Sequence, residues 1–191
     1  LNESATDLAA SLSDLAPLAD GVTKFRLNRA KLDCAFHAGD DETIAKLAKE
    51  MKSPFYRAIT KNIEQQNEGG RRVLDYRPVF QKRNACVPAS VASVLGTFDI
   101  HLNEDELADE LTYRGTELWR AIEWLKERGF VVRPFIASPE LVCKLIDNGV
   151  SFVYTLTGLT ESHAVAAIGV DKNARTLIWH DPNSERWGQI L

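Results

Sequence analysis

The sequence lacks paired cysteines and long apolar runs. Only three cysteines occur among the 191 residues, at Cys34, Cys86 and Cys143, and their spacing fits neither a disulfide framework nor a zinc ribbon. No apolar run approaches the roughly 20 residues that a membrane-spanning helix needs. We therefore expect a chain without disulfides, in a reducing environment, and without a membrane segment.

The charged residues are evenly mixed and leave a small negative balance. The formal net charge is -4, and the sequence has no basic stripe of the kind that binds nucleic acid. A glycine-rich phosphate loop, a metal-ligand cluster and a dinucleotide-binding fingerprint are also missing from the sequence. These features predict no nucleic-acid partner and no cofactor. The apolar fraction of 45% is that of an ordinary globular protein that can bury a core.

The two ends of the chain leave its completeness open. The first residues are acidic and rich in alanine, unlike a signal peptide, and we expect a cytoplasmic location. Leu1 is not an initiating methionine, which leaves open that the natural N-terminus is missing. The strand pattern stops at Ile190 and Leu191, where a further element could follow. A C-terminal truncation is therefore also left open.

Residues 1 to about 67 have helical periodicity throughout. Helices are expected over residues 7–15, 22–36, 42–51 and 55–65. The order of helix, Gly39-Asp40 turn, helix, Pro54 and helix resembles the antiparallel helix pairs of tetratricopeptide-type repeats. Such repeats usually occur in longer arrays, so the segment could be the end of one. Its expected role is to present or recognise a peptide or protein partner.

A polar segment with a glycine pair separates this region from the rest of the chain. Glu68-Gly69-Gly70-Arg71-Arg72 is interpreted as a boundary. The sequence thus predicts a helical domain over residues 1–70 and a second domain over residues 71–191. The Gly-Gly pair also raises the idea of self-cleavage, but a plain linker is favoured because this dipeptide is common in loops.

The second region mixes helical and strand patterns. Helices are expected over residues 86–95, 103–111, 116–129 and 138–147, the second and fourth capped by Asn103 and Ser138. Strands are expected over residues 130–136, 150–156, 163–170 and 176–180, with a hairpin turn at residues 171–174. Helices followed by antiparallel strands predict an α+β domain.

Cys86 stands where an extended segment becomes an apolar helix. The free amide groups and the positive dipole end of a helix stabilise a thiolate, which is the nucleophilic form of cysteine. Gln81, just upstream, could donate from its side-chain amide to a developing oxyanion, although a loop Gln is usually a surface residue. A cysteine at this place can also be a buried structural residue. Cys34 and Cys143 have apolar helical surroundings and are interpreted as core residues.

A histidine and a carboxylate stand at strand ends far downstream. His163 follows a polar loop and begins an apolar strand, so its imidazole can project into a cleft and act as a general base. Asp181 precedes Pro182, which ends the strand, and its carboxylate can fix the tautomer and orientation of His163. Asp181 could instead cap its own turn. His180 is the rival base, and His37 and His101 are interpreted as solvated or packing residues.

Gln81, Cys86, His163 and Asp181, in this order, resemble the papain-like peptidase fold in its bacterial double-glycine leader peptidase branch. The resemblance covers roughly residues 72 to 191. Connecting positions match as well, namely Gly115, Thr116, Gly129, Phe130 and Gly149. The resemblance implies a domain with a helical half that carries the nucleophile and an antiparallel sheet that carries the base.

The resemblance implies a thiol-dependent cysteine peptidase that acts on a peptide or protein. Cys86 would be the nucleophile, His163 the base and Asp181 its orienting group, with Gln81 and the Cys86 amide as oxyanion donors. Val87 stands where the family usually has Gly, and the gap from Gln81 to Cys86 is one residue shorter than usual. These departures keep an inactive peptide-binding module open, and a thiol amidohydrolase or deamidase is a third possibility.

Two further expectations concern side chains around this site. Strand alternation places His180 and Asp181 on opposite sides, which favours His163 as the partner of Asp181. Trp119, Trp124 and Trp179 are expected to be core or cleft-wall residues. Trp187 lies in a polar tail and could line a substrate groove.

Overall fold

A computed structural model describes residue 17 and residues 20–51, 53–65, 69–82, 84–113, 115–158 and 162–183. The chain divides into two compact units, Leu1–Arg71 with Lys172–Thr176, and Arg72–Asp171 with Leu177–Leu191. The predicted domain boundary at residue 70 stays a prediction. The helix expected over residues 7–15, Glu68 of the expected linker and Trp187 lie outside the described residues.

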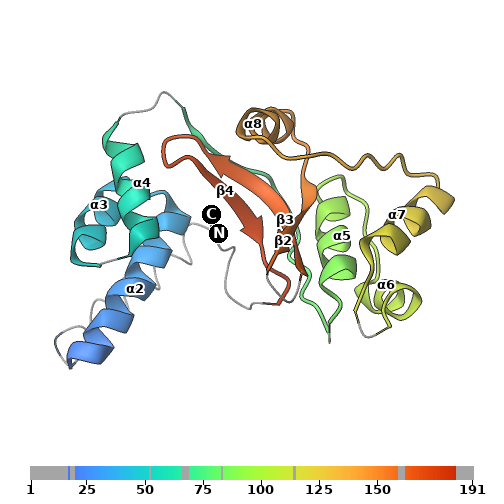
Figure 1. Cartoon of the computed structure of the whole chain (residues 1–191), viewed down its shortest axis with the longest axis horizontal. Helices are drawn as coiled ribbons and strands as arrows, with labels where there is room; N and C mark the ends of the chain where they lie inside the picture. The colour runs from blue at the N-terminus through green and yellow to red at the C-terminus, as the bar shows by residue number, and fades with distance from the viewer. Residues whose placement is uncertain are drawn as a thin grey trace. The chain divides into compact units, whose positions relative to one another are not determined.

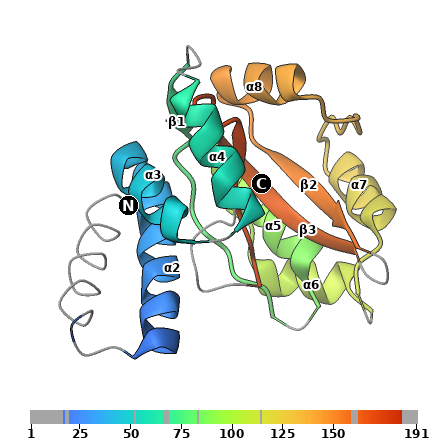
Figure 2. The ribbon, with the colours of Figure 1, turned by 60° about the vertical axis from the view of Figure 1, so that its left-hand side comes forward.

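Among its described residues, the first unit contains three helices, α2 (Gly21–Ala38), α3 (Asp41–Glu50) and α4 (Pro54–Glu64) (Figures 1 and 2). These confirm the helices predicted over residues 22–36, 42–51 and 55–65. The carboxylates of Asp20 and Asp40 cap α2 and α3 by accepting backbone N–H bonds from Thr23 and Thr43 at 2.8 and 3.0 Å. Gly39 ends α2 in the left-handed region, at φ 72°.

The core of this unit is built from the apolar faces of these helices. Its most deeply buried side chains include Leu32, Phe36, Ile44 and Ile59. The Tyr56 hydroxyl donates to the Asp33 carboxylate, which joins α4 to α2. These contacts explain why three short helices hold together, since each needs a neighbour to bury its apolar stripe. The resemblance to tetratricopeptide repeats stays a prediction.

The second unit begins with the helices α5 (Cys86–Gly96), α6 (Glu104–Leu111), α7 (Leu118–Glu127) and α8 (Pro139–Asp147). Helix α5 is central and mostly buried, as its nearly all-apolar sequence requires. It packs into one cluster with α6, α7 and β3 (Ser162–Asp171). The buried members of this cluster are Val87, Val91, Leu95, Leu107, Leu111, Ala121 and Ala164.

The sheet is formed by β1 (Arg71–Val73), β2 (Phe152–Thr157), β3 and β4 (Thr176–His180). Its order is β1-β3-β2, and β4 also pairs with β3. β2 and β3 are antiparallel, with Phe152 opposite Ala167 and Leu156 opposite His163. β3 is buried from Ala164 to Asp171 because α5 covers it in Figure 1 and strands flank it. Mixed helices and an antiparallel sheet confirm the predicted α+β class.

The strand predicted over residues 130–136 is wrong. The structure has no strand between residues 130 and 138, where Val131 and Ile136 are 84% and 94% exposed. A strand of this composition would bury one face, and Pro134 has no N–H for a ladder bond. Phe130 packs against the core cluster of α5, and the ring of Phe135 lies edge-on to Phe152 with ring centroids 5.3 Å apart.

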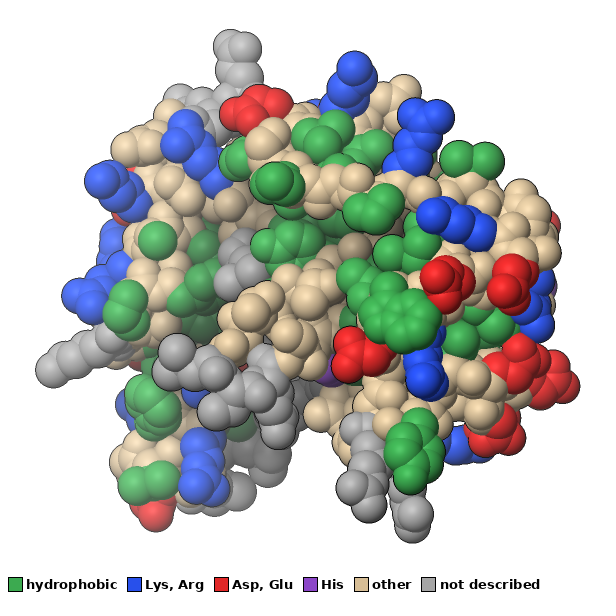
Figure 3. All heavy atoms as spheres, turned by 45° about the vertical axis from the view of Figure 1, so that its right-hand side comes forward, with side chains coloured by type: hydrophobic (Ala, Val, Ile, Leu, Met, Phe, Trp, Pro, Cys, Tyr) green, Lys and Arg blue, Asp and Glu red, His purple; other side chains and the backbone are tan. Residues whose placement is uncertain are grey.

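Several apolar side chains of this segment and of α7 are exposed, among them Val131, Ile136 and Leu118. Figure 3 shows hydrophobic side chains gathered on the face that holds α7 and the segment before α8. Trp119 is 54% exposed, so it is not a core residue, and a place in a cleft wall stays a prediction for it. Trp179 is buried and Trp124 is partly buried, as predicted. In the described part of the chain, no helix has the length and apolarity to cross a membrane.

Candidate active site

Cys86 is the first residue of α5, as the sequence predicted. The chain enters the helix through Asn84, which has a left-handed φ of 56°, and Ala85, the N-cap. No side chain caps this helix start. The first helical hydrogen bond runs from the Ala89 N–H to the Ala85 carbonyl at 3.1 Å. The amide groups before Ala89 are therefore the positive end of the helix dipole, and the thiol stands beside them.

Cys86 is partly buried and packs against the cluster between α5 and β3. That cluster includes Ala164, the neighbour of His163 on β3. The start of α5 and the start of β3 therefore share one packed core. Cys34 and Cys143 are also only partly buried, and burial raises the pKa of the Cys34 thiol.

His163 and Asp181 form a hydrogen-bonded pair. The imidazole Nε2 lies 2.7 Å from Oδ1 of the carboxylate, and the two side chains are 30% and 15% exposed. The same Oδ1 accepts the backbone N–H of Asn183 at 2.9 Å. The Asx turn expected at Asp181 and the bond to His163 therefore coexist, because one carboxylate oxygen has two lone pairs.

Gln81 lies beside the turn that follows Asp181. Its backbone N–H donates to the Pro182 carbonyl at 2.8 Å. Its side-chain Nε2 donates to Oδ1 of Asn183 at 3.4 Å. The structure thus brings together His163, Asp181 and Gln81 through the start of β3 and the turn after β4. Cys86 packs against the cluster that holds Ala164, the neighbour of His163.

The comparisons with known proteins bear on this arrangement. A family model described as the Peptidase_C39 like family matches residues 73–190. The chain belongs to this family. The match covers the region in which the sequence resembled a papain-like peptidase domain and confirms that prediction. At the level of the family, it indicates a cysteine peptidase with a peptide or protein substrate. No curated protein and no solved structure matches the chain.

In this C39-like domain, His180 does not share the carboxylate of Asp181 with His163. It is buried, its Nε2 donates to the Val79 carbonyl at 2.9 Å, and its ring packs against Tyr76 and Phe80. Burial lowers the pKa of His180. His180 is the last residue of β4 and Asp181 follows it, and side chains of successive extended residues point to opposite faces. His101 is exposed beside Asp99, and the His37 side chain lies outside the described part.

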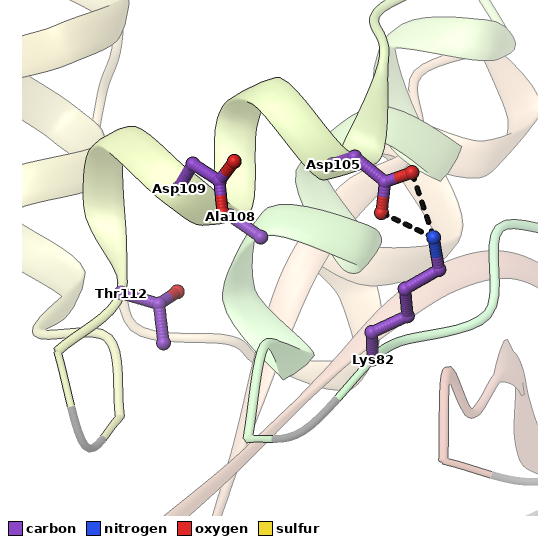
Figure 4. A pocket seen from close by; sticks show the side chains of 5 residues that line it. All are labelled: Lys82, Asp105, Ala108, Asp109 and Thr112. Atoms are coloured by element: carbon purple, nitrogen blue, oxygen red, sulfur yellow. Dashed lines mark hydrogen bonds and ion pairs between the residues drawn. The ribbon is translucent and has the colours of Figure 1, made fainter.

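A pocket of about 630 Å³ opens next to the segment that leads from Gln81 into α5 (Figure 4). Its lining consists of Lys82, Asp105, Ala108, Asp109 and Thr112. The Lys82 ammonium binds both carboxylate oxygens of Asp105, at 2.5 and 2.7 Å. This ion pair raises the pKa of Lys82. The wall that α6 contributes is acidic, and this pocket was not predicted from the sequence.

Asn183, like this pocket, was not predicted from the sequence. It contacts both Asp181 and Gln81, yet in the sequence it was only part of a turn. The common occurrence of Asn in turns gives no signal for a role at a distance. Among the described residues, no group of three His, Cys, Asp or Glu side chains is placed to hold a metal ion.

Proposed function

We propose that the chain is a cysteine peptidase with the triad Cys86, His163 and Asp181. The observation that supports it most is the 2.7 Å bond between His163 and Asp181 at the end of the sheet on which the Cys86 helix packs. A carboxylate in this position holds one tautomer and one ring orientation of the histidine. The family match supports the reaction class, and this geometry supports the choice of residues.

The hydrogen bond to Asp181 assigns different tasks to the two ring nitrogens. Because Nε2 is held by Asp181, Nδ1 is the nitrogen left to take the proton of the Cys86 thiol. The thiolate then attacks the carbonyl carbon of the scissile amide, and the carbonyl electrons move to the oxygen. As the carbonyl re-forms and the C–N bond breaks, His163 gives the proton to the leaving amine, and a thioester with Cys86 remains. A water deprotonated by His163 then attacks this thioester, the C–S bond breaks, and the Cys86 sulfur is released with the acid product.

The oxyanion of the tetrahedral intermediate would be bound at the start of α5. The backbone N–H of Cys86 is one donor, since it has no side-chain cap and no preceding helical carbonyl. The side-chain amide of Gln81 is the second. Donors that are fixed before the reaction stabilise developing charge without reorganisation.

Val87 does not argue for an inactive module. Its side chain is 6% exposed and packs with Leu107 and Leu111 in the core of the second unit. A branched side chain at this position therefore fills the core instead of the surface beside the thiol. This packing supports the catalytic proposal over the peptide-binding alternative. The helices over residues 1–70 would present or recognise the peptide or protein partner.

The test compares Cys86→Ala with the matched control Cys143→Ala, a second partly buried cysteine. Cys86→Ala should abolish peptide cleavage, whereas Cys143→Ala should retain it. In the control variant, iodoacetamide should alkylate Cys86 rapidly even at about pH 6, where an ordinary thiol is almost fully protonated. Full cleavage activity in Cys86→Ala would falsify the proposal. Alkylation only above about pH 8 would favour the inactive module.

A further inference from the structure

We propose that Asn183 is a positioning residue that holds the Gln81 amide in place relative to Asp181. This inference rests on the proposed function, because it gives Gln81 the role of an oxyanion donor. Asn183 would touch neither the substrate nor the thiol. It would act through the two residues that it connects, which lie on segments far apart in the sequence.

The contacts of Asn183 run in two directions. Its backbone N–H donates to Oδ1 of Asp181 at 2.9 Å, the same atom that receives His163 Nε2. Its side-chain Oδ1 accepts from Gln81 Nε2 at 3.4 Å, across 102 residues of sequence. The neighbouring Pro182 carbonyl accepts the Gln81 backbone N–H at 2.8 Å. One short turn thus binds the acid of the triad and both the backbone and the side chain of the oxyanion donor.

Gln81 needs such a partner because its own segment has no regular structure. Residues 74–82 are neither helix nor strand, and a Gln side chain has several rotatable bonds that a catalytic donor must have fixed beforehand. The bond to Pro182 fixes the backbone of Gln81. The bond to Asn183 uses one N–H of Nε2 and leaves the other for the oxyanion.

The buried end of the Gln81 amide defines its orientation. Oε1 of Gln81 is sealed from solvent and has no hydrogen-bond partner among the described atoms. Asn183 therefore supplies the only polar contact of this side-chain amide in the described part of the chain. An acceptor at this place selects the orientation that turns the nitrogen of Gln81 toward the turn. Without this acceptor, the Gln81 side-chain amide could adopt either of its two orientations.

The experiment uses the full chain and two substitutions of one residue. Asn183→Ala removes the side-chain acceptor but keeps the backbone N–H that binds Asp181. Asn183→Asp keeps an accepting oxygen at the same place. The first measurement is ¹⁵N relaxation of the Gln81 side-chain amide, assigned by its loss in Gln81→Ala. We expect an ordered amide in the wild type and in Asn183→Asp, and a mobile one in Asn183→Ala.

The second measurement is the hydrolysis of a fluorogenic peptide amide. Asn183→Ala should lower kcat by about tenfold to a hundredfold with little change in KM, because an oxyanion donor acts in the transition state. Asn183→Asp should restore most of this loss. The double variant Gln81→Ala with Asn183→Ala should be no slower than Gln81→Ala alone, since both remove one function.

The outcomes separate this inference from the proposed function. An equally ordered Gln81 amide in Asn183→Ala overturns the positioning role, whatever the chain's activity. Equal kcat losses in Asn183→Ala and Asn183→Asp also overturn it, because they would trace the effect to something other than the acceptor. Iodoacetamide alkylation of Cys86 forms no oxyanion and should be unchanged in both variants. If Cys86 of the wild type is not alkylated rapidly at about pH 6, the proposed function is contradicted. The relaxation of the Gln81 amide still decides whether Asn183 positions Gln81.

Discussion

His163 on β3 and Asp181 after β4 lie 18 residues apart in sequence, with Nε2 and Oδ1 at 2.7 Å. The hairpin between these strands explains the contact, because β4 pairs with β3 and returns the chain to the level of His163. The carboxylate is more buried than the imidazole. The inner side of the ring is therefore anchored, and the outer side stays accessible for proton transfer.

The first prediction concerns the charge and the shape of Asp181. In Asp181→Asn, an amide oxygen can still accept from His163 Nε2 and from the Asn183 N–H. In Asp181→Ala, both bonds are lost and the ring can turn. We expect kcat/KM for a peptide substrate to fall by about 10²-fold in Asp181→Ala, and by clearly less in Asp181→Asn. Equal activity of Asp181→Ala and the wild type, with both folded by circular dichroism, would contradict the assignment.

The second prediction concerns stability and the buried His180. Burial lowers its pKa in the folded state, so the unfolded chain takes up a proton near pH 6.5, before the folded chain does. The free energy of unfolding is therefore highest above about pH 6.5 and falls as the pH decreases toward the folded pKa. The negative charge of Asp181 opposes this lowering of the His180 pKa. The aromatic rings of Tyr76 and Phe80 contact the imidazole.

The matched variant for this prediction is His180→Gln, whose amide can still donate to the Val79 carbonyl but does not titrate. Urea unfolding at pH 7.5 and at lower pH should show a smaller loss of stability on acidification in His180→Gln than in the wild type. Parallel pH profiles of the two proteins would show that His180 does not carry this part of the acid sensitivity.

The sequence predicted most helices because their signals are local. Asp20 and Asp40 are N-caps, Gly39 is a C-cap, and apolar residues recur at helical spacing between them. The strand expected over residues 130–136 failed because an apolar segment does not reveal whether a partner strand exists. In the fold, Val131 and Ile136 face solvent, and that outcome depends on the tertiary arrangement.

The candidate site was predictable where it follows from alternation along one strand. His180 ends β4 and Asp181 follows it, and the alternation expected for these two residues favoured His163 as the partner of the carboxylate. The bond from Gln81 to Asn183 could not be predicted in this way. It joins two irregular segments 102 residues apart, and no periodicity or cap pattern relates them.

The third prediction concerns Gly169, where β3 passes β1 closely. A Cβ at this position would lie 2.5 Å from the Arg72 carbonyl oxygen and 3.1 Å from the Val73 Cα. Both are backbone atoms, so the strands would have to separate. Gly169→Ala should lower the free energy of unfolding by about 1–3 kcal/mol, as overpacking does. Gly70→Ala is the control, because nothing lies within 4 Å of a Cβ there. Urea denaturation measures the free energy of unfolding of both variants, and equal values would contradict the prediction.

The last prediction concerns the N-cap of α3 in the helical unit. Hydrogen bonds from the hydroxyl and the backbone N–H of Thr43 lower the pKa of the Asp40 carboxyl below 3.8. This stabilisation is thus present above about pH 4 and is lost as the pH falls through the folded pKa. Asp40→Ala should cost about 1 kcal/mol at pH 7, and Asp40→Asn much less because its oxygen still accepts the Thr43 N–H. Equal urea midpoints for Asp40→Ala and Asp40→Asn at pH 7 would show that this cap does not stabilise α3.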